Sequence, residues 1–270
     1  MKRRDKGEEL TEKRVTEKKK EKSWLRRNLS TIIVSLMMIV GIGLLVYPSL
    51  ADYWNSFHQT RAIMSYTEDV AKMDRSELDA IIASAKEYNH KIALNGIEWK
   101  LKDNDLEKYN RELNFSGHGN MGYITIDKIK VNLPIYHGTS ESVLQTSVGH
   151  IEGSSLPVGA LSYDYEEMMV TDEEDGSHCV LSAHRGLPSA RLFTDLDKLV
   201  EGDIFTLNIL GETFTYQVDQ IRIVEPTDLS ELAVEKGQDY CTLVTCTPYG
   251  INTHRLLVRG HRVANPQGDV

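Results

Sequence analysis

A stretch of 24 residues without a single charge, 28–51, constrains this chain more than any other feature of its sequence. A helix needs about 20 apolar residues to span a bilayer, so this stretch is long enough to cross one. A cleaved signal peptide is the alternative, but its apolar region is usually about 7–15 residues long and ends in a small-x-small site. Here the stretch ends in Tyr47-Pro48-Ser49-Leu50, which is a poor cleavage site. We therefore predict a single transmembrane anchor over residues 29–50.

Charge is distributed unevenly on the two sides of this anchor. Residues 1–29 contain 12 Lys/Arg and 6 Asp/Glu, while the rest of the chain contains 19 Lys/Arg and 34 Asp/Glu. Basic flanks stay on the cytoplasmic side, so we predict a basic cytoplasmic tail at residues 1–28, disordered or loosely helical, and an extracellular location for the chain that follows the anchor. The acidic body would repel phosphates, which argues against a nucleic-acid partner.

The residues after the anchor divide into a helical part and a strand-rich part. Apolar side chains recur near helical spacing between residues 70 and 92, so we predict a helical N-terminal extension over 51–118. Residues 119–264 contain short segments rich in β-branched and aromatic residues, bounded by turns, and then a short tail at 265–270. The expected strands cover 123–136 (two strands), 179–183, 203–210, 213–224, 240–246 and 255–263. Such a series favours a mainly β fold, an all-β barrel.

An acidic stretch interrupts the strand pattern at residues 161–178. It contains seven Asp/Glu and no Lys or Arg. We predict a solvated loop, because acidic side chains are mostly exposed. A calcium site is the alternative, since hard cations bind clustered carboxylates, although the Asp-x-Asp-x-Asp-Gly spacing of an EF-hand is absent.

The chain contains three cysteines, so at least one thiol is unpaired in an exported domain. Cys246 stands where a predicted strand gives way to Thr-Pro-Tyr-Gly, a turn-rich sequence that would leave its thiol partly exposed. Cys241 is five positions earlier, so on a regular strand it faces the other side. An isolated cysteine is more often a buried apolar residue than a nucleophile, and its surroundings must decide.

Two further residues stand at strand ends, as Cys246 does. His184 follows an apolar strand and precedes a Gly/Pro turn, which suits acid–base assistance to a thiol. Arg255 begins the strand after Cys246, and antiparallel pairing of the two strands would place both side chains at one rim, where an arginine stabilises a tetrahedral intermediate. A zinc site at His178 and Cys179 is the alternative, but no Cys-x₂-Cys or His-x₃-His pair is present. A serine hydrolase is disfavoured because the Gly-x-Ser-x-Gly motif is absent.

These motifs resemble those of a known family. Thr242-Leu-Val-Thr-Cys246, with Arg255 nine positions later, resembles the sortase signature, and Ser182-Ala-His184-Arg-Gly resembles the histidine motif of the same family. The resemblance extends over roughly residues 45–263 and is most specific to class C, the pilin-polymerising sortases. The segments that resemble class C include Leu133-Pro-Ile-Tyr-His-Gly-Thr139, Ser154-Ser-Leu-Pro-Val-Gly159, His184-Arg-Gly-Leu-Pro-Ser-Ala-Arg-Leu-Phe-Thr-Asp-Leu196 and Cys246-Thr-Pro-Tyr-Gly-Ile-Asn-Thr-His-Arg255.

The resemblance implies an eight-stranded sortase β-barrel with N-terminal helices and a cysteine transpeptidase activity. Cys246 would be the nucleophile, His184 the general acid/base and Arg255 the oxyanion or substrate-positioning residue. The implied reaction cleaves a Leu-Pro-x-Thr-Gly-like sorting signal after Thr through a thioester, and a pilin lysine amine then resolves it. No metal or organic cofactor is implied. The partners would be pilin subunits or surface proteins that carry such signals.

We also predict substrate contacts for Ser182, Thr245 and Thr253. Many class C members cover the site with an Asp-Pro-aromatic lid, but no proline occurs between residues 49 and 133 here. Trp99 is a possible substitute lid, with core packing as the alternative. Many members also have a second, C-terminal hydrophobic segment, whereas here we expect one anchor.

Two other functions stay open at this point. A housekeeping-type sortase would join surface proteins to a cell wall precursor instead of a pilin lysine. A membrane-tethered binding barrel would need no nucleophile at all.

Overall fold

The computed structural model describes residues 5–265, so residues 1–4 of the predicted basic tail and 266–270 of the predicted C-terminal tail lie outside it. The chain divides into two compact units, residues 1–50 and 51–270. Helix α1 runs from Asp5 to Val70. It includes residues 5–27, for which we expected a disordered or loosely helical tail.

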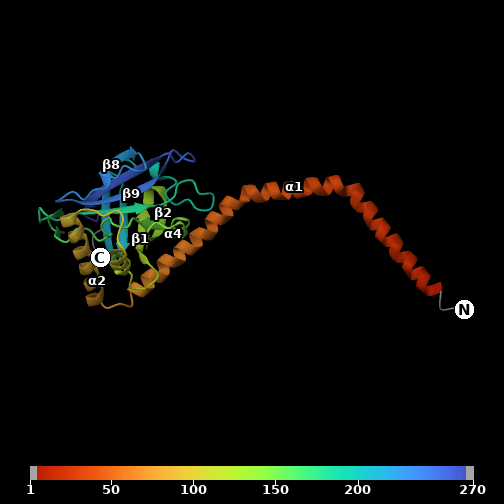
Figure 1. The fold of residues 1–270 in the computed structure, drawn as a ribbon, viewed down its shortest axis with the longest axis horizontal. Coiled ribbons are helices and arrows are strands. Elements are labelled where there is room, and N and C mark those ends of the chain that lie inside the picture. The colour runs from red at the N-terminus through yellow and green to blue at the C-terminus, as the bar shows by residue number, and fades with distance from the viewer. Residues whose placement is uncertain (1–4, 266–270) are drawn as a thin grey trace. The chain divides into compact units, whose positions relative to one another are not determined.

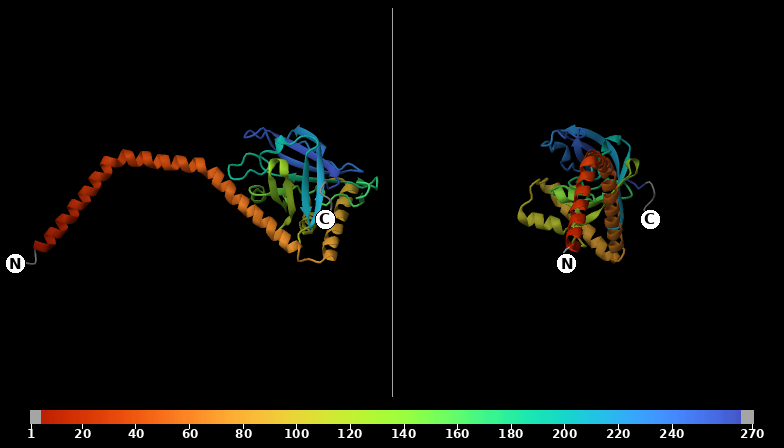
Figure 2. Two further views of the ribbon diagram at one scale, coloured as in Figure 1. Left: turned by 180° about the vertical axis from the view of Figure 1, so that it is seen from behind. Right: turned by 90° about the vertical axis from the view of Figure 1, so that its right-hand side faces the viewer.

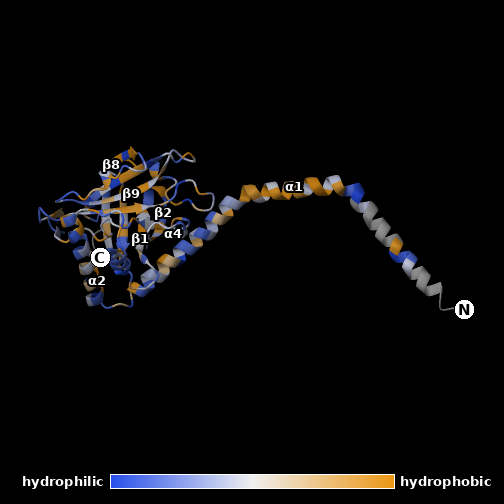
Figure 3. Ribbon diagram, in the orientation of Figure 1, coloured by the Kyte–Doolittle hydropathy of each residue, from blue (hydrophilic) through white to orange (hydrophobic). Residues whose placement is uncertain are grey.

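The predicted anchor forms part of α1. The segment Arg26–Val70 contains a window of mean hydropathy 2.6 with none of its residues buried, so its length and composition suit a membrane crossing. Figure 3 shows these apolar residues as the orange part of α1. The single N-terminal apolar helix expected from the sequence is therefore present.

Eight strands close into a barrel in the order β1-β2-β3-β6-β9-β10-β8-β7, which confirms the predicted fold class (Figure 1). The barrel strands are β1 (Asn120–Ile126), β2 (Val131–His137), β3 (Val148–His150), β6 (Ser177–Ser182), β7 (Ile204–Ile209), β8 (Glu212–Val224), β9 (Asp239–Thr247) and β10 (His254–Val263). Strand β3 was not predicted. It has three residues, too few to show a two-residue alternation.

The β7–β8 hairpin shows how local sequence sets the register. Leu210 and Gly211 join the two strands with φ angles of 49° and 85°. A two-residue turn with positive φ at both positions matches the twist of paired strands, and glycine adopts such a φ without strain. The hairpin closes on the pair Ile209–Glu212, so Phe214 and Tyr216 are placed in the barrel interior.

Helices precede the barrel and short helical turns connect its strands. α2 (Arg75–Asn95) lies alongside the barrel in the views of Figures 1 and 2. Its buried Asn89 donates amide hydrogen bonds to the carbonyl oxygens of Leu156 and Gly159 at 2.9 and 2.8 Å. The remaining helical elements are α3 (Asp103–Arg111), α4 (Glu141–Leu144), η1 (Asp127–Ile129), η2 (Leu196–Lys198) and η3 (Ser230–Leu232).

The acidic stretch 161–178 is not simply a solvated loop, and that expectation was wrong in part. It contains the two-stranded sheet β4 (Tyr163–Asp164) and β5 (Met169–Val170). The Asp175 side chain is fully buried and lies 2.9 Å from His90 Nδ1 on α2. Its other oxygen accepts hydrogen bonds from the N–H and the hydroxyl of Ser162. One of the seven carboxylates therefore links this segment to α2.

The barrel has two ends of different character. At the closed end, where β9 begins and β10 finishes, Asp239 and Arg262 are buried among aromatic rings. The Arg262 guanidinium lies 4.4 Å from the Phe214 ring centroid, and the Tyr216 hydroxyl donates to Asp239 Oδ1 at 3.2 Å. Burial raises the pKa of Asp239. At the site end, β9 finishes and β10 begins, and the predicted catalytic residues lie there.

Candidate active site

Antiparallel pairing of β9 and β10 brings Cys246 opposite Arg255. The two residues are direct partners in the strand register, as expected from the short connection between them. Cys246 is a free, partly exposed cysteine, whereas Cys179 and Cys241 are buried. The buried Cys241 belongs to the main hydrophobic core, which fits the prediction that it faces the other side of the strand.

Parallel pairing of β6 and β9 brings the third residue to the same end. Ser182 is the register partner of Val244, and the Ala183 N–H donates to the Val244 carbonyl at 3.2 Å. His184 follows two residues after Ser182, beyond the end of β6, just as Cys246 follows two residues after Val244 on β9. Cys246 and Arg255 are therefore paired on β9 and β10, and His184 lies just past the end of the neighbouring strand β6.

A long loop, residues 183–195, follows β6 and folds back so that its end contacts His184. The Phe193 N–H donates to the His184 carbonyl at 3.1 Å, and the Gly186 N–H donates to the Thr194 hydroxyl at 3.1 Å. The tip of this loop contacts α1. The Asn55 amide donates to the Ser189 carbonyl at 2.8 Å, and the Arg191 N–H donates to Asp52 Oδ1 at 2.9 Å.

A second loop, between β9 and β10, meets the first one near His184. It begins with a cis Thr247–Pro248 peptide and exposes the side chains of Tyr249 and Ile251. A Cβ atom at Gly186 would lie 3.0 Å from the Tyr249 ring, and Gly186 has a φ of 78°. The backbone angle favours glycine at this point, and a larger residue would also displace the Tyr249 ring. Two exposed apolar side chains thus border the site end.

An apolar cluster covers the sheet next to the site. Val180, Val244 and Leu257 of β6, β9 and β10 form it together with Leu232 of η3, and Trp99 packs against it. Since side chains alternate along a strand, Val244 shares its face with Cys246. Contact with this cluster accounts for the partial burial of Trp99. Its role as a lid stays a prediction.

The predicted substrate-contacting residues lie in different environments. Ser182 is partly buried at the end of β6. Thr253 is exposed, and its hydroxyl lies 2.9 Å from His254 Nδ1. Thr245 is buried, and its hydroxyl donates to the Ala183 carbonyl at 2.8 Å. Direct contact of these residues with substrate stays a prediction.

Arg185 is a site residue that the sequence analysis did not single out. It follows His184, and only 8% of its side chain is exposed. Nη1 donates to the Thr247 hydroxyl at 3.1 Å, and Nη2 forms an ion pair with Asp197. The only signal for it in the sequence was its position next to the candidate histidine, which could not show the contact with Thr247.

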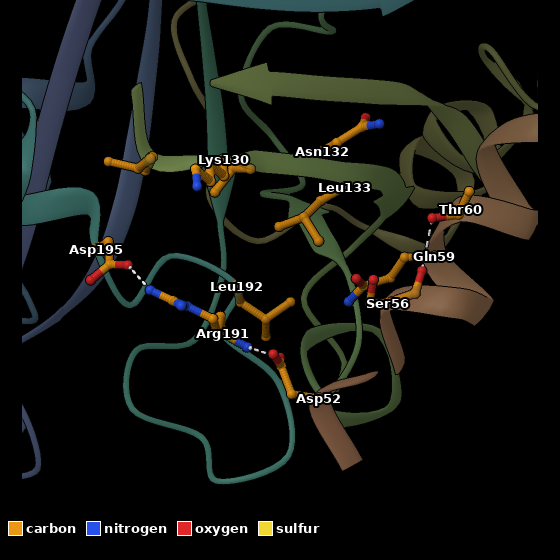
Figure 4. A pocket seen from close by; sticks show the side chains of 12 residues that line it. Asp52, Ser56, Gln59, Thr60, Lys130, Asn132, Leu133, Arg191, Leu192 and Asp195 are labelled. Carbon is orange, nitrogen blue, oxygen red and sulfur yellow. Dashed lines mark hydrogen bonds and ion pairs between the residues drawn. The ribbon is translucent and has the colours of Figure 1, made fainter. Parts of the chain in front are cut away.

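A cavity of about 250 Å³ opens at the site end between α1, the β1–β2 turn and the loop of residues 183–195 that contains His184 (Figure 4). Asp52, Lys130, Arg191 and Asp195 give it a mixed charge, and Arg191 forms an ion pair with Asp195. Among residues 5–265, no group of three or more His, Cys, Asp or Glu side chains is arranged to hold a metal ion.

Comparison with known proteins identifies the family. Residues 124–263 match the sortase domain family. The chain is similar to the crystal structure of sortase C1 from Streptococcus agalactiae, with 56% identity and a TM-score of 0.69, over 76% of this chain and 99% of that one. It is also similar to Streptococcus pneumoniae sortase C, with 41% identity and a TM-score of 0.64, over 76% of this chain and 97% of that one.

A more distant relative is sortase D of Bacillus subtilis (strain 168), which is 28% identical over 145 residues. That match covers 53% of this chain and 63% of the relative, just under two thirds of its length. The sortase domain match covers more than half of the chain, and the similarity to sortase C1 spans nearly that whole structure. The chain therefore belongs to the sortase family.

Proposed function

We propose that the protein is a membrane-anchored transpeptidase that joins pilin subunits. The observation that carries this proposal is the placement of a partly exposed Cys246 opposite Arg255, with His184 just beyond the end of the strand that pairs with β9. A thiol, an imidazole and a guanidinium at one rim can supply the nucleophile, the acid/base and the oxyanion donor for acyl transfer. The similarity to the sortase C structures supports a class C activity, since the crystal structure of Streptococcus pneumoniae sortase C provides insights into pilin substrate specificity.

The proposed reaction proceeds in two halves. The Cys246 thiolate attacks the Thr carbonyl of a Leu-Pro-x-Thr-Gly-like signal, and Arg255 stabilises the oxyanion that forms. The C–N bond to Gly breaks, His184 protonates the leaving amine, and a thioester remains on Cys246. A pilin lysine amine then attacks the thioester carbonyl, His184 takes its proton, and the thiolate leaves. One amide bond is broken and one isopeptide bond is made, so no oxidant or cofactor takes part.

The proposal includes a single-pass location in the cell membrane. The apolar window of α1 would cross the bilayer, with the basic residues 1–28 on the cytoplasmic side and the barrel outside. This orientation places Cys246 where exported substrates arrive.

Deletion of the gene, followed by analysis of cell-wall extracts for pilin ladders, tests the pilin assignment. We expect the high-mass ladders to disappear and to return with the wild-type gene but not with Cys246→Ala. Unchanged ladders, together with loss of surface proteins from the wall, would favour the housekeeping-type alternative. Full complementation by Cys246→Ala would favour the non-enzymatic binding barrel.

A further inference from the structure

Two side-chain hydrogen bonds flank the catalytic pair on either side. The Thr245 hydroxyl donates to the Ala183 carbonyl at 2.8 Å, which joins the residue before Cys246 to the residue before His184. Arg185 Nη1 donates to the Thr247 hydroxyl at 3.1 Å, which joins the residue after His184 to the residue after Cys246. We call these two bonds the bracket.

The bracket occupies a place where regular pairing of the two strands stops. β6 finishes at Ser182, two residues before His184, whereas β9 continues to Thr247. The bond from the Ala183 N–H to the Val244 carbonyl extends the pairing by one residue. Beyond this backbone bond, the two side-chain hydrogen bonds of the bracket connect the segment that contains His184 to the segment that contains Cys246.

Burial makes both bonds hard to exchange for bonds to water. Thr245 is 2% exposed and Thr247 is 7% exposed, and 8% of the Arg185 side chain is exposed. A buried polar group that loses its partner is left with the full cost of its desolvation. Arg185 is held from its other side by the ion pair with Asp197, so its guanidinium is a fixed donor for Thr247.

We propose that Thr245, Thr247 and Arg185 are positioning residues that set the separation of the Cys246 thiol and the His184 ring. The inference rests on the proposed function, because it assigns a role in the reaction of those two groups. Proton transfer requires hydrogen-bond distances between the reacting groups and the side chain that assists them. Displacement of a catalytic group by about 1 Å can cost about 100-fold in rate. Side chains that hold two catalytic segments in register therefore affect the rate without touching the substrate.

Isosteric substitutions test the bracket. Thr245→Val and Thr247→Val each remove one hydroxyl and keep the volume, and Thr245→Ser and Thr247→Ser restore the hydroxyl. Thr242→Val is the matched control, because Thr242 is also buried on β9 and its hydroxyl bonds to His178 Nε2 at 2.7 Å, away from the pair. The measurements are kcat, KM and the pH dependence of kcat with a Leu-Pro-x-Thr-Gly peptide, at a temperature at which every variant is folded.

We expect each valine variant of the bracket to lower kcat by about 10- to 100-fold, with KM nearly unchanged and a shifted pH profile of kcat. The serine variants should recover most of the rate, and Thr242→Val should lower the melting temperature while kcat stays at the wild-type value. Bracket variants with the kcat and pH profile of Thr242→Val would overturn the inference. A rise in KM with an unchanged kcat would overturn the inference in favour of the direct substrate contact predicted for Thr245.

The same experiment separates this inference from the proposed function. A wild-type enzyme that forms no acyl-enzyme with any such peptide would refute both. A wild-type enzyme that turns over, with bracket variants that turn over equally fast, would refute the bracket alone.

Discussion

The same residue types occur at the two ends of the barrel, but they are buried in one set of positions and partly exposed in the other. Strand β6 has His178 along its length and His184 just beyond its end, β9 has Cys241 and Cys246, and β10 has Arg262 and Arg255. At the closed end or in the barrel wall, the first member of each pair is buried. At the site end, the second member is partly exposed. Position along a strand, more than residue type, therefore separates a structural side chain from a reactive one.

The cysteine pair should show the largest difference. Cys246→Ala removes the nucleophile, so we expect peptide cleavage to fall by at least about 1,000-fold. Cys241→Ala leaves a small cavity in the core, which should lower the free energy of unfolding by about 1–2 kcal/mol and leave kcat nearly unchanged. Peptide turnover and urea unfolding of both variants check this. An active Cys246→Ala enzyme, or an inactive but folded Cys241→Ala enzyme, would reverse the comparison.

Arg262 should matter for stability and not for chemistry. Arg262→Met removes the buried guanidinium that faces the Phe214 ring and whose charge favours the ionised form of Asp239, so we expect the free energy of unfolding to fall by about 2 kcal/mol. Chemical denaturation measures this loss, and the kcat of the remaining folded enzyme should match that of the wild type. Wild-type stability in this variant would contradict the structural role of the closed end.

Arg255 should show the converse behaviour. Arg255→Ala removes the proposed oxyanion donor, so we expect kcat to fall by about 100- to 1,000-fold. Because Arg255 is partly exposed, the melting temperature should change little. Steady-state kinetics and thermal unfolding together check this. A variant that loses stability but keeps kcat would place Arg255 with Arg262 as a structural residue.

The histidine pair predicts a smaller effect, on the pH dependence of stability. His178 lies between the Ala233 carbonyl and the Thr242 hydroxyl, and burial, together with the charge of Arg259, lowers its pKa to about 4. The unfolded chain protonates this residue near pH 6.5, so stability present above that pH is lost as the pH falls toward 4. We expect His178 to contribute a loss of about 2 kcal/mol between pH 7 and pH 5.

Urea unfolding of wild type and His178→Gln at both pH values measures this contribution. The decline between pH 7 and pH 5 should be smaller in His178→Gln by about the predicted amount. Equal declines in the two proteins would show that His178 is not a buried neutral residue.

Much of the barrel could be predicted from the sequence, because most strands are long enough to show their pattern. The pairing of Cys246 with Arg255 was predictable for the same reason that hairpins are, since the two strands are consecutive and the connection is short. The placement of His184 depended on the parallel pairing of β6 and β9. These strands are distant in the chain, and nothing local in either one specifies the other.

Some features were missed because their elements are short, and others because they depend on contacts between distant segments. The strands β4 and β5 have two residues each, too few to show an alternation, whereas the burial of Asp175 depends on its contact with His90 of α2. The role of Arg185 emerges only when Thr247 is known to lie within its reach. The composition of the acidic stretch predicted exposed side chains, and most of its carboxylates are exposed in the structure. Composition alone could not single out Asp175, which is buried.

The central claim is that Cys246 forms a thioester with a sorting signal, and intact-mass measurement tests it most directly. The full-length protein is incubated with a Leu-Pro-x-Thr-Gly peptide, quenched in acid and compared with Cys246→Ala and Cys241→Ala. We predict a mass increase equal to the peptide fragment that ends in Thr less one water, on the wild type and on Cys241→Ala; it should be absent from Cys246→Ala and removed by hydroxylamine. An adduct that persists on Cys246→Ala, or no adduct on the folded wild type with any such peptide, would contradict the account.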